Sequence, residues 1–361
     1  MVKRFIERLL FMSLGRKLGI ILAVFAIVPS YFIYSHVMTI YEDDMVKVAS
    51  RNLQSIVKAN NSLIDTTLNR IEDISYLFLS NKECYDCFSK MDQFSVSDFL
   101  KQERLISDVL GKQFMTNDTV YAKYLYTSKW MFGGSSKSSM NVTFQDIQRS
   151  ILDQKAVEAG GQATWITGYD YGEWFQTEYL NKKENYEYQY PITMVRQMNF
   201  QYTNNGNLYY MKSNQERPIL IVHVLEETLS SLYEPSVNYE GSIYAVANEE
   251  GRIISSDSDA FPITELVPEQ ILKLRTSSGY TSYWINDMEY LLCYDTMEER
   301  NWFSFCLIPM TELIQHTKAE MQSSQMWVTI ILLSASVLIA VGRILKYSRR
   351  ALITWKRKLQ G

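Results

Sequence analysis

The sequence is poor in the residues that metal centres and most catalytic sites depend on. Its 361 residues include three histidines and four cysteines, which are not spaced like the ligands of a metal site. The spacings G-x-S-x-G and H-E-x-x-H and that of a P-loop do not occur. Asp170 and Glu173 form a carboxylate pair by sequence, but no further catalytic motif accompanies them. We therefore expect a protein that is not an enzyme and that needs no cofactor or metal.

Two long runs of the sequence, residues 18–41 and 321–342, carry no charge. Each is long enough to cross a bilayer as a helix. The first run is longer than the core of a cleaved signal peptide, and no A-x-A-like site follows it, which favours an uncleaved anchor. Basic residues flank both runs on their outer side, which predicts cytoplasmic termini and an extracellular central region. The flanking residues are Lys3, Arg4, Arg8, Arg16, Lys17, Arg343, Lys346, Arg349, Arg350, Lys356, Arg357 and Lys358.

Acidic residues outnumber basic ones between the two runs. The whole chain has a net charge of −4 although both tails are basic, so the central region must be acidic. An acidic domain argues against nucleic-acid binding, which needs a basic surface. The basic tails suit the anionic head groups of a lipid bilayer, which is the first partner that the sequence predicts.

Proline and glycine are missing from residues 44–79. Apolar residues recur there at steps of three and four or their multiples, which predicts one helix about 54 Å long. Such a helix can run from a membrane along the side of two stacked domains. It is either a spacer packed on these domains or the dimerisation helix of a homodimer, and the two interpretations are compatible.

Strand-like runs and short helices then follow in two rounds, among them a predicted helix over residues 143–159 and a predicted strand over residues 218–225. The first round contains Asn205-Gly206, a strong hairpin signal, and the second a predicted hairpin around Asn286-Asp287. The pattern predicts an α+β fold with two tandem units, each an antiparallel sheet with flanking helices. The predicted order is a basic tail (1–17), a transmembrane helix (18–41), a long outer helix with a helical linker (42–112), a membrane-distal unit (113–238), a membrane-proximal unit (239–310), an exit helix (311–320), a second transmembrane helix (321–342) and a second basic tail (343–361).

Four stretches of the sequence resemble the double Cache (dCache) sensor module of bacterial receptors, and most closely the sensor half of YesM-type histidine kinases. They read AGGQATWITG, RPILIVHVLEETLSSLY, GSIYAVANEEGRIISS and NDMEYLLCYDTMEERNWFSFCLIP. The resemblance extends over most of residues 20 to 345. It implies PAS-like (Cache) units outside the cell and a small-molecule ligand in the membrane-distal unit.

The sequence departs from the kinases after the second apolar run. The segment ALITWKRKLQG is too short for a HAMP linker, and the phosphoacceptor histidine and glycine-rich boxes are missing. We expect a sensor that signals through a partner receptor or kinase in the membrane. The alternatives are a truncated or split sensor kinase and a structural membrane protein without a ligand.

Arg196 lies in a predicted strand over residues 190–200. A period of two places it on one face with Ile192, Met194 and Met198, so it is a cation on an otherwise apolar face. A buried charge needs a partner, which is either an internal carboxylate or an anionic group of a ligand; the third alternative is that Arg196 is exposed at the sheet edge.

Aromatic residues supply the other candidates for a ligand pocket. Trp165 and the loop GYDYGEWFQTEY can form flat apolar walls, with acids for an ammonium group or for hydroxyls. Trp165 can equally be a core residue and the loop plain surface. The motif Tyr-x4-Arg-x-Trp-Tyr of the amino-acid-binding relatives does not occur, so an amino-acid ligand has no support. The candidate ligand-binding residues are Tyr124, Tyr126, Trp165, Tyr169, Asp170 and Arg196.

The four cysteines form two pairs by sequence. Cys293 and Cys306 lie on consecutive predicted strands, where a cross-strand disulfide and two buried thiols fit equally well. Cys84 and Cys87 form the motif C-Y-D-C, which fits a local disulfide or free thiols without a redox role.

Overall fold

The computed structural model describes residues 14–115, 119–133, 144–172, 189–233 and 239–314, together with four single residues further on. The segment Ser50–Pro309 forms one compact body. The candidate site and both sheets belong to this body.

The long helix α2 covers Leu14–Phe78 without interruption. It therefore includes the predicted helix over 44–79 and also the first charge-free run, in which Pro29 is accommodated within the helix. The second charge-free run lies almost entirely outside the described residues. Within the described part of the chain, no helix has both the length and the apolar character that a membrane span requires.

Two five-stranded antiparallel sheets form the body. The first has the order β2-β1-β7-β4-β3 and the second β10-β11-β12-β8-β9. Counted within each sheet, both run 2-1-5-4-3, so the second repeats the first, and the predicted α+β class is confirmed. The strands are β1 (Val120–Tyr126), β2 (Met131–Phe132), β3 (Thr164–Ile166), β4 (Ile192–Gln197), β7 (Ile219–Val224), β8 (Ile243–Ala247), β9 (Ile253–Ser256), β10 (Gly279–Ile285), β11 (Met288–Thr296) and β12 (Phe303–Pro309). We call residues 120–233 and 243–309 the first and the second sheet domain.

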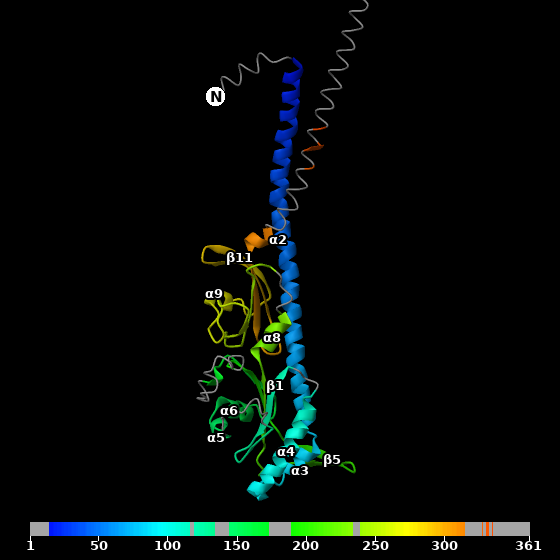
Figure 1. The fold of residues 1–361 in the computed structure, drawn as a ribbon, viewed down its shortest axis with the longest axis vertical. Helices are drawn as coiled ribbons and strands as arrows, with labels where there is room; N and C mark the ends of the chain where they lie inside the picture. The colour runs from blue at the N-terminus through cyan, green and yellow to red at the C-terminus, as the bar shows by residue number, and fades with distance from the viewer. Residues whose placement is uncertain are drawn as a thin grey trace, which may run out of the picture. The chain divides into compact units, whose positions relative to one another are not determined.

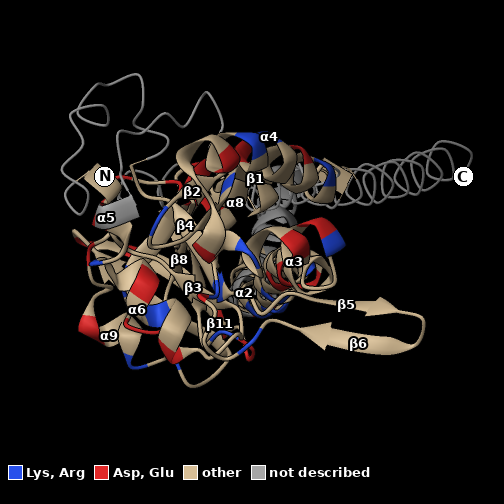
Figure 2. Ribbon diagram, turned by 90° about the horizontal axis from the view of Figure 1, so that it is seen from below, with Lys and Arg blue, Asp and Glu red and all other residues tan. Residues whose placement is uncertain are grey.

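Two tight hairpins are set by residues that tolerate positive φ. In the first, β5 (Gln201–Asn204) and β6 (Asn207–Tyr210) are joined by Asn205 and Gly206, with φ of 48° and 79°. Asn286 and Asp287 join β10 to β11 with φ of 48° and 63°. Such angles match the twist of the flanking strands, which is why these dipeptides predict hairpins. The β5–β6 hairpin projects from the body (Figure 2).

Short helices with polar caps complete the body. The helix predicted over residues 143–159 is in fact two helices, because the Ser150 side chain accepts a hydrogen bond from the Leu152 amide and starts a new helix. Ser95 and Asp98 form a capping box at the start of α4. The helices are α3 (Lys82–Phe88), the 3₁₀ helix η1 (Met91–Gln93), α4 (Val96–Gln113), α5 (Phe144–Ile147), α6 (Ile151–Glu158), α8 (Glu226–Tyr233) and α9 (Glu269–Leu272).

Each sheet lies between α2 and its own short helices (Figure 1). Residues of α5 and α6 pack on one face of the first sheet, in a core that includes Tyr124, Val195 and Ile221. The second sheet has a matching core that includes Phe303 and Phe305 on the face covered by α9. Since α2 contacts the opposite face of both sheets, the two sheet domains share one helix.

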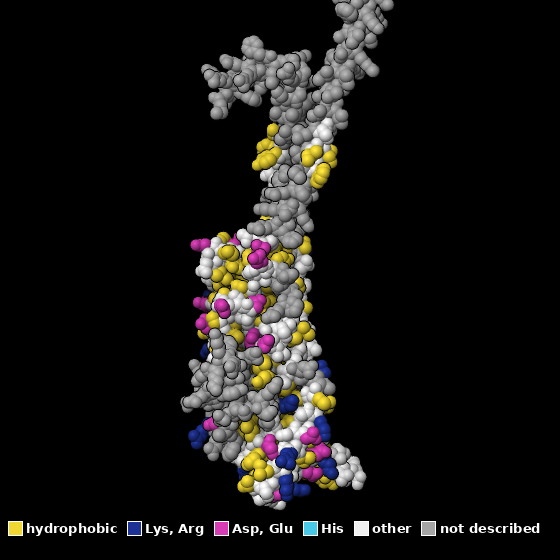
Figure 3. Space-filling view, viewed as in Figure 1, with side chains coloured by type: hydrophobic (Ala, Val, Ile, Leu, Met, Phe, Trp, Pro, Cys, Tyr) yellow, Lys and Arg dark blue, Asp and Glu magenta, His cyan; other side chains and the backbone are white. Residues whose placement is uncertain are grey.

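Charge is unevenly spread over the body. On the face seen in Figure 3, acidic side chains gather over the second sheet domain, and most visible Lys and Arg side chains lie toward the α3–α4 end. The acidic character predicted for the central region is therefore most evident in the second sheet domain.

All four cysteines are buried free thiols. Cys293 and Cys306 lie directly opposite one another on β11 and β12, and Cys293 Sγ lies 3.8 Å from the Ser50 carbonyl oxygen. Of the two arrangements that the sequence left open for this pair, the structure has the thiols.

Candidate functional site

A row of polar side chains crosses the face of the first sheet that α5 and α6 cover. The central strand β7 alternates, so His223 shares this face with Ile219 and Ile221 of the core. Thr193 of β4 pairs directly with His223 across the ladder. The row therefore arises from three neighbouring strands that meet at the centre of the sheet.

Hydrogen bonds join these side chains into a chain of four members. Tyr124 Oη lies 2.8 Å from His223 Nε2, and His223 Nδ1 lies 2.8 Å from Thr193 Oγ1. Thr193 Oγ1 in turn lies 2.5 Å from Tyr169 Oη. The ring of Tyr171 stands edge-on to the imidazole with its centroid at 5.6 Å. All five side chains are buried. We call the four hydrogen-bonded residues the tyrosine–histidine network.

Burial keeps this network uncharged. Because desolvation disfavours the imidazolium, the pKa of His223 falls to about 3. Burial likewise raises the pKa of Tyr124 and Tyr169 well above the usual value for a phenol. At neutral pH, His223 thus has one N–H and one acceptor nitrogen.

The direction of the hydrogen bonds follows from counting protons. The two phenols, the threonine hydroxyl and the neutral imidazole bring four protons to three contacts. One O–H therefore serves a contact outside these three, and the Tyr171 side chain, which hydrogen-bonds with Tyr124, supplies such a contact.

The structure brings together two of the predicted ligand-binding residues, Tyr124 and Tyr169. Tyr126 lies on the same face and is buried further along β1. It borders a groove of about 480 Å³ that is also lined by Asp153 and Glu216. Asp170 accepts a hydrogen bond from the Gln189 side chain.

Trp165 and Arg196 lie on the opposite face of the sheet. Trp165 pairs with Met194, so it shares the face of Arg196, and both contact α2. Trp165 Nε1 donates to Glu72 Oε1 at 2.6 Å, and Arg196 Nη1 donates to the Glu72 carbonyl oxygen at 3.4 Å. The Arg196 guanidinium also lies 5.8 Å from the centroid of the Tyr76 ring. The six predicted residues do not form a single site, because the sheet separates these two from the tyrosine–histidine network.

Sequence reasoning missed His223 and Thr193, whereas Tyr171 belongs to the loop that was expected to line a pocket. The signal for His223 was present, since the period of two that singled out Arg196 also places His223 on an apolar face of β7. The signal for Thr193 was weaker, because a threonine within a strand is unremarkable until its cross-strand partner is known.

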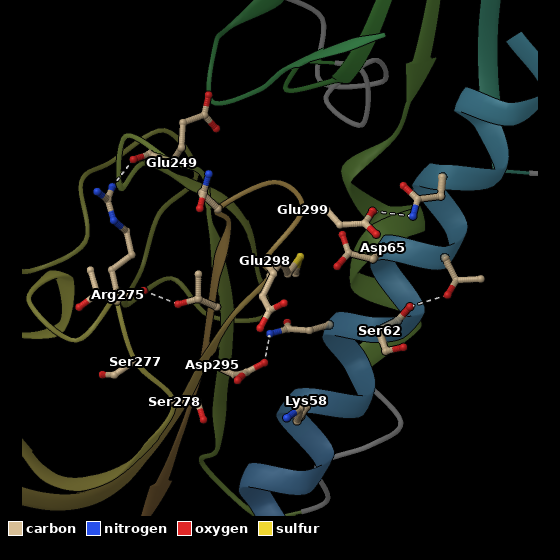
Figure 4. Close-up of a pocket in the computed structure, with 17 residues that line it drawn as sticks. Lys58, Ser62, Asp65, Glu249, Arg275, Ser277, Ser278, Asp295, Glu298 and Glu299 are labelled. Atoms are coloured by element: carbon tan, nitrogen blue, oxygen red, sulfur yellow. Dashed lines mark hydrogen bonds between the residues drawn. The ribbon is translucent and has the colours of Figure 1, made fainter. Parts of the chain in front are cut away.

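A second hollow lies between α2 and the second sheet domain (Figure 4). This cleft measures about 1000 Å³. At its edge, the buried Asp295 accepts a hydrogen bond from Asn61 Nδ2 at 2.8 Å. Its charged lining residues are Lys58, Asp65, Glu249, Arg275, Asp295, Glu298 and Glu299. Across the described residues, no three His, Cys, Asp or Glu side chains are grouped as metal ligands.

Of the comparisons with known proteins, the one with solved structures found a similar fold. No family model matches the sequence, and no curated protein matches it either. The sensory domain of the Campylobacter jejuni chemoreceptor Tlp3 superposes with a TM-score of 0.50 at 12% identity, over 76% of this chain and 98% of that domain.

Two further solved structures are similar over comparable lengths. The ligand-binding domain of the Pseudomonas fluorescens chemoreceptor CtaA, solved with L-isoleucine, has a TM-score of 0.48 at 10% identity, over 76% of this chain and 96% of that one. The sensor domain of the V. cholerae histidine kinase DctB has a TM-score of 0.46 at 13% identity, over 73% and 98%. The closer likeness to YesM-type kinases stays a prediction. Residues 50–309 have the fold of the Tlp3 sensory domain.

Proposed function

We propose that the protein is a membrane-anchored sensor that binds a small molecule in its first sheet domain. The observation that carries this proposal is the tyrosine–histidine network, which lines the α5–α6 face of that sheet with hydrogen-bonding groups. A buried polar chain of this kind stabilises one structure only while each of its members is satisfied. A ligand that exchanges a hydrogen bond with one member therefore interacts with the network as a whole.

The proposed ligand is uncharged and polar, as a sugar is. The network offers hydroxyl groups and a neutral imidazole, and Arg196 lies on the far side of the sheet. Hydroxyl groups and aromatic faces recognise neutral polar molecules without the desolvation cost of an ion.

A thermal-shift screen of the full chain in detergent tests this proposal. Binding to the folded state raises the melting temperature, by an amount that grows with ligand concentration. Saccharides, organic acids and amino acids form the three arms of the screen. We expect hits among the saccharides that weaken about tenfold in Tyr124→Phe and Tyr169→Phe, the loss of one hydrogen bond.

Tyr233→Phe is the matched control for these variants. Tyr233 Oη lies 2.6 Å from Ser255 Oγ and is also buried, but it lies outside the network. The control should bind the ligand as the wild type does. Hits that survive unchanged in Tyr124→Phe and Tyr169→Phe would place the ligand elsewhere, and a screen without hits would contradict the proposal.

The anchoring rests on the two charge-free runs, residues 18–41 and 321–342, with their basic flanks. In this arrangement both termini are cytoplasmic and the sheet domains are extracellular. Protease treatment of intact cells tests the topology, with a tag at either terminus. Both tags should remain protected while the central region is cleaved, and cleavage of either tag would refute the arrangement.

The signalling route that we propose runs through a partner receptor or kinase in the membrane. Its support is that α2 contacts both sheet domains and can pass a change in one of them to the other. Crosslinking in membranes followed by mass spectrometry should recover a receptor or kinase chain. Recovery of this chain alone would favour a purely structural role.

A homodimer along α2 fits the same route. Residues at steps of three and four form an exposed stripe on the side of α2 that faces away from the sheets, which is the spacing of a helix-pairing seam. The stripe comprises Asn52, Ser55, Ala59, Leu63, Thr66, Arg70, Asp73 and Leu77. Ala59→Cys should form a disulfide-linked dimer in membranes, and a monomer under mild oxidation would argue against the pairing.

A further inference from the structure

One side-chain oxygen atom of α2, Glu72 Oε1, accepts hydrogen bonds from both sheet domains. Glu72 Oε1 accepts a hydrogen bond from Trp165 Nε1 of the first domain at 2.6 Å. The same atom accepts one from Arg300 Nη2 of the second domain, also at 2.6 Å. The two donors are 135 positions apart in the numbering, yet the Arg300 guanidinium lies 5.9 Å from the centroid of the Trp165 ring. Glu72 is thus the point at which the two domains and the helix meet.

Both terminal nitrogens of Arg300 are engaged at this point. It lies in the loop between β11 and β12, and its side chain is 7% exposed. Its Nη1 contacts Asp65 at 2.5 Å and Glu299 at 3.7 Å, and its Nη2 also donates to the Asn69 side chain. Burial raises the pKa of Asp65 above its ordinary value although the bond to Arg300 lowers it. Burial disfavours the charged form of the Asp65 carboxyl, and its contact with Arg300 offsets part of that cost.

Trp165 connects the same point to the tyrosine–histidine network. It lies in β3, and the chain continues from there through Thr167 to Tyr169, four residues on. The Thr167 hydroxyl accepts a hydrogen bond from Asn248 of the second domain at 3.2 Å, and Tyr169 is a member of the network. One short segment, residues 165–169, therefore carries both Trp165, which contacts Glu72, and Tyr169, which belongs to the network.

We infer that Glu72 acts as a shared latch, through which β3 of the first domain controls the β11–β12 loop of the second. A displacement of β3 withdraws the indole N–H from Glu72 Oε1. The carboxylate is then free to turn, and the positions of Arg300 and of its loop change with it. Since coupling between two sites is reciprocal, a change at Arg300 must also reach β3. The latch exists without ligand, and only its use in sensing rests on the function proposed above.

Hydrogen exchange of the full chain in detergent, without ligand, tests the latch. The Met297 amide donates to the Trp302 carbonyl oxygen at 2.7 Å and closes the β11–β12 loop, so its protection reports on the loop. Trp165→Phe keeps an aromatic side chain of smaller size and removes the indole N–H. We expect about tenfold faster exchange at Met297, as the loss of a hydrogen bond to a charged group gives.

Trp130→Phe is the matched control. Trp130 Nε1 also donates to a carboxylate, Glu103 Oε2 of α4 at 2.9 Å, and this contact involves neither Glu72 nor Arg300. This control should leave the exchange of Met297 unchanged. Equal acceleration in both variants, or none in Trp165→Phe, would overturn the latch.

Two further variants keep the test decisive if Trp165→Phe loosens the whole fold. Glu72→Gln keeps the shape of the side chain and removes its charge, and it should accelerate exchange at Met297. Arg300→Lys should accelerate exchange of the β3 amides by reciprocity, whereas the amides of α4 should keep their wild-type rates. Unchanged rates at β3 in Arg300→Lys would refute the coupling.

Discussion

Acidification should destabilise the protein through His223. Burial lowers the pKa of this imidazole to about 3 in the folded state, whereas an unfolded chain has a histidine pKa of about 6.5. Between these two values the unfolded chain binds a proton that the folded chain cannot bind. The contribution of the neutral His223 is therefore fully present above pH 6.5 and is lost as the pH falls toward 3.

The size of the effect follows from proton linkage. Each pH unit below 6.5 lowers the free energy of unfolding by about 1.4 kcal/mol as long as one proton distinguishes the two states. From pH 7.5 to 5.0 the loss from His223 amounts to about 2 kcal/mol. Carboxylates titrate over part of this range, so the measurement must isolate the imidazole.

The variant His223→Gln isolates the contribution of the imidazole to the pH dependence of stability. Urea unfolding of the full chain, followed by tryptophan fluorescence at several pH values, gives the free energy of unfolding for both proteins. The wild type should lose about 2 kcal/mol more than His223→Gln between pH 7.5 and 5.0. His36→Gln removes a histidine outside the compact body and should follow the wild type. Parallel curves for the wild type and His223→Gln would show that His223 is not held neutral.

Three further outcomes can be measured on the same preparation. Arg300→Met leaves Asp65 and Glu72 without their partner and should cost about 3 kcal/mol in urea unfolding; a cost below about 1 kcal/mol would contradict a buried ion pair. Ser95→Ala removes the capping box with Asp98 and should cost about 1 kcal/mol, which an unchanged melting temperature would refute. The cysteine thiols are buried, and burial raises their pKa, so the folded protein should not react with maleimide at pH 7.5 and the unfolded protein should bind four equivalents. Rapid labelling of the folded protein would contradict this burial in the four residues Cys84, Cys87, Cys293 and Cys306.

The sheets were predictable because their signals are local. Asn205-Gly206 and Asn286-Asp287 specify turns by their own backbone preferences, so both hairpins follow from the sequence. The short, almost continuous apolar run of β7 likewise indicated a buried strand. The break at Ser150 was missed, since a serine within an apolar pattern becomes a helix cap only when its side chain turns back to the backbone.

The candidate site was only partly predictable, because a period of two separates two faces without saying what covers each of them. The sequence indicated that Arg196 needs a partner if it is buried, and it left Trp165 as either a pocket wall or a core residue. In the structure, both side chains contact α2. Their contacts with Glu72 join residues more than ninety positions apart. Such long-range contacts leave no local pattern in the chain, so the sequence could not show that these two residues and Tyr124 lie on opposite faces.

The strand order of the two sheets has a consequence for how the chain folds during synthesis. In each sheet the central strand is the last to be made, so neither sheet can close until its whole domain has emerged. The closing contact of the first sheet joins Tyr124 to His223, 99 positions apart, whereas Ala247 and Phe303 of the second sheet are little more than half as far apart. A contact that closes a longer stretch of chain forms more slowly. We therefore expect the first sheet domain to emerge first and to finish folding last. The sheet-facing side of α2 is fully buried only after both sheets have formed.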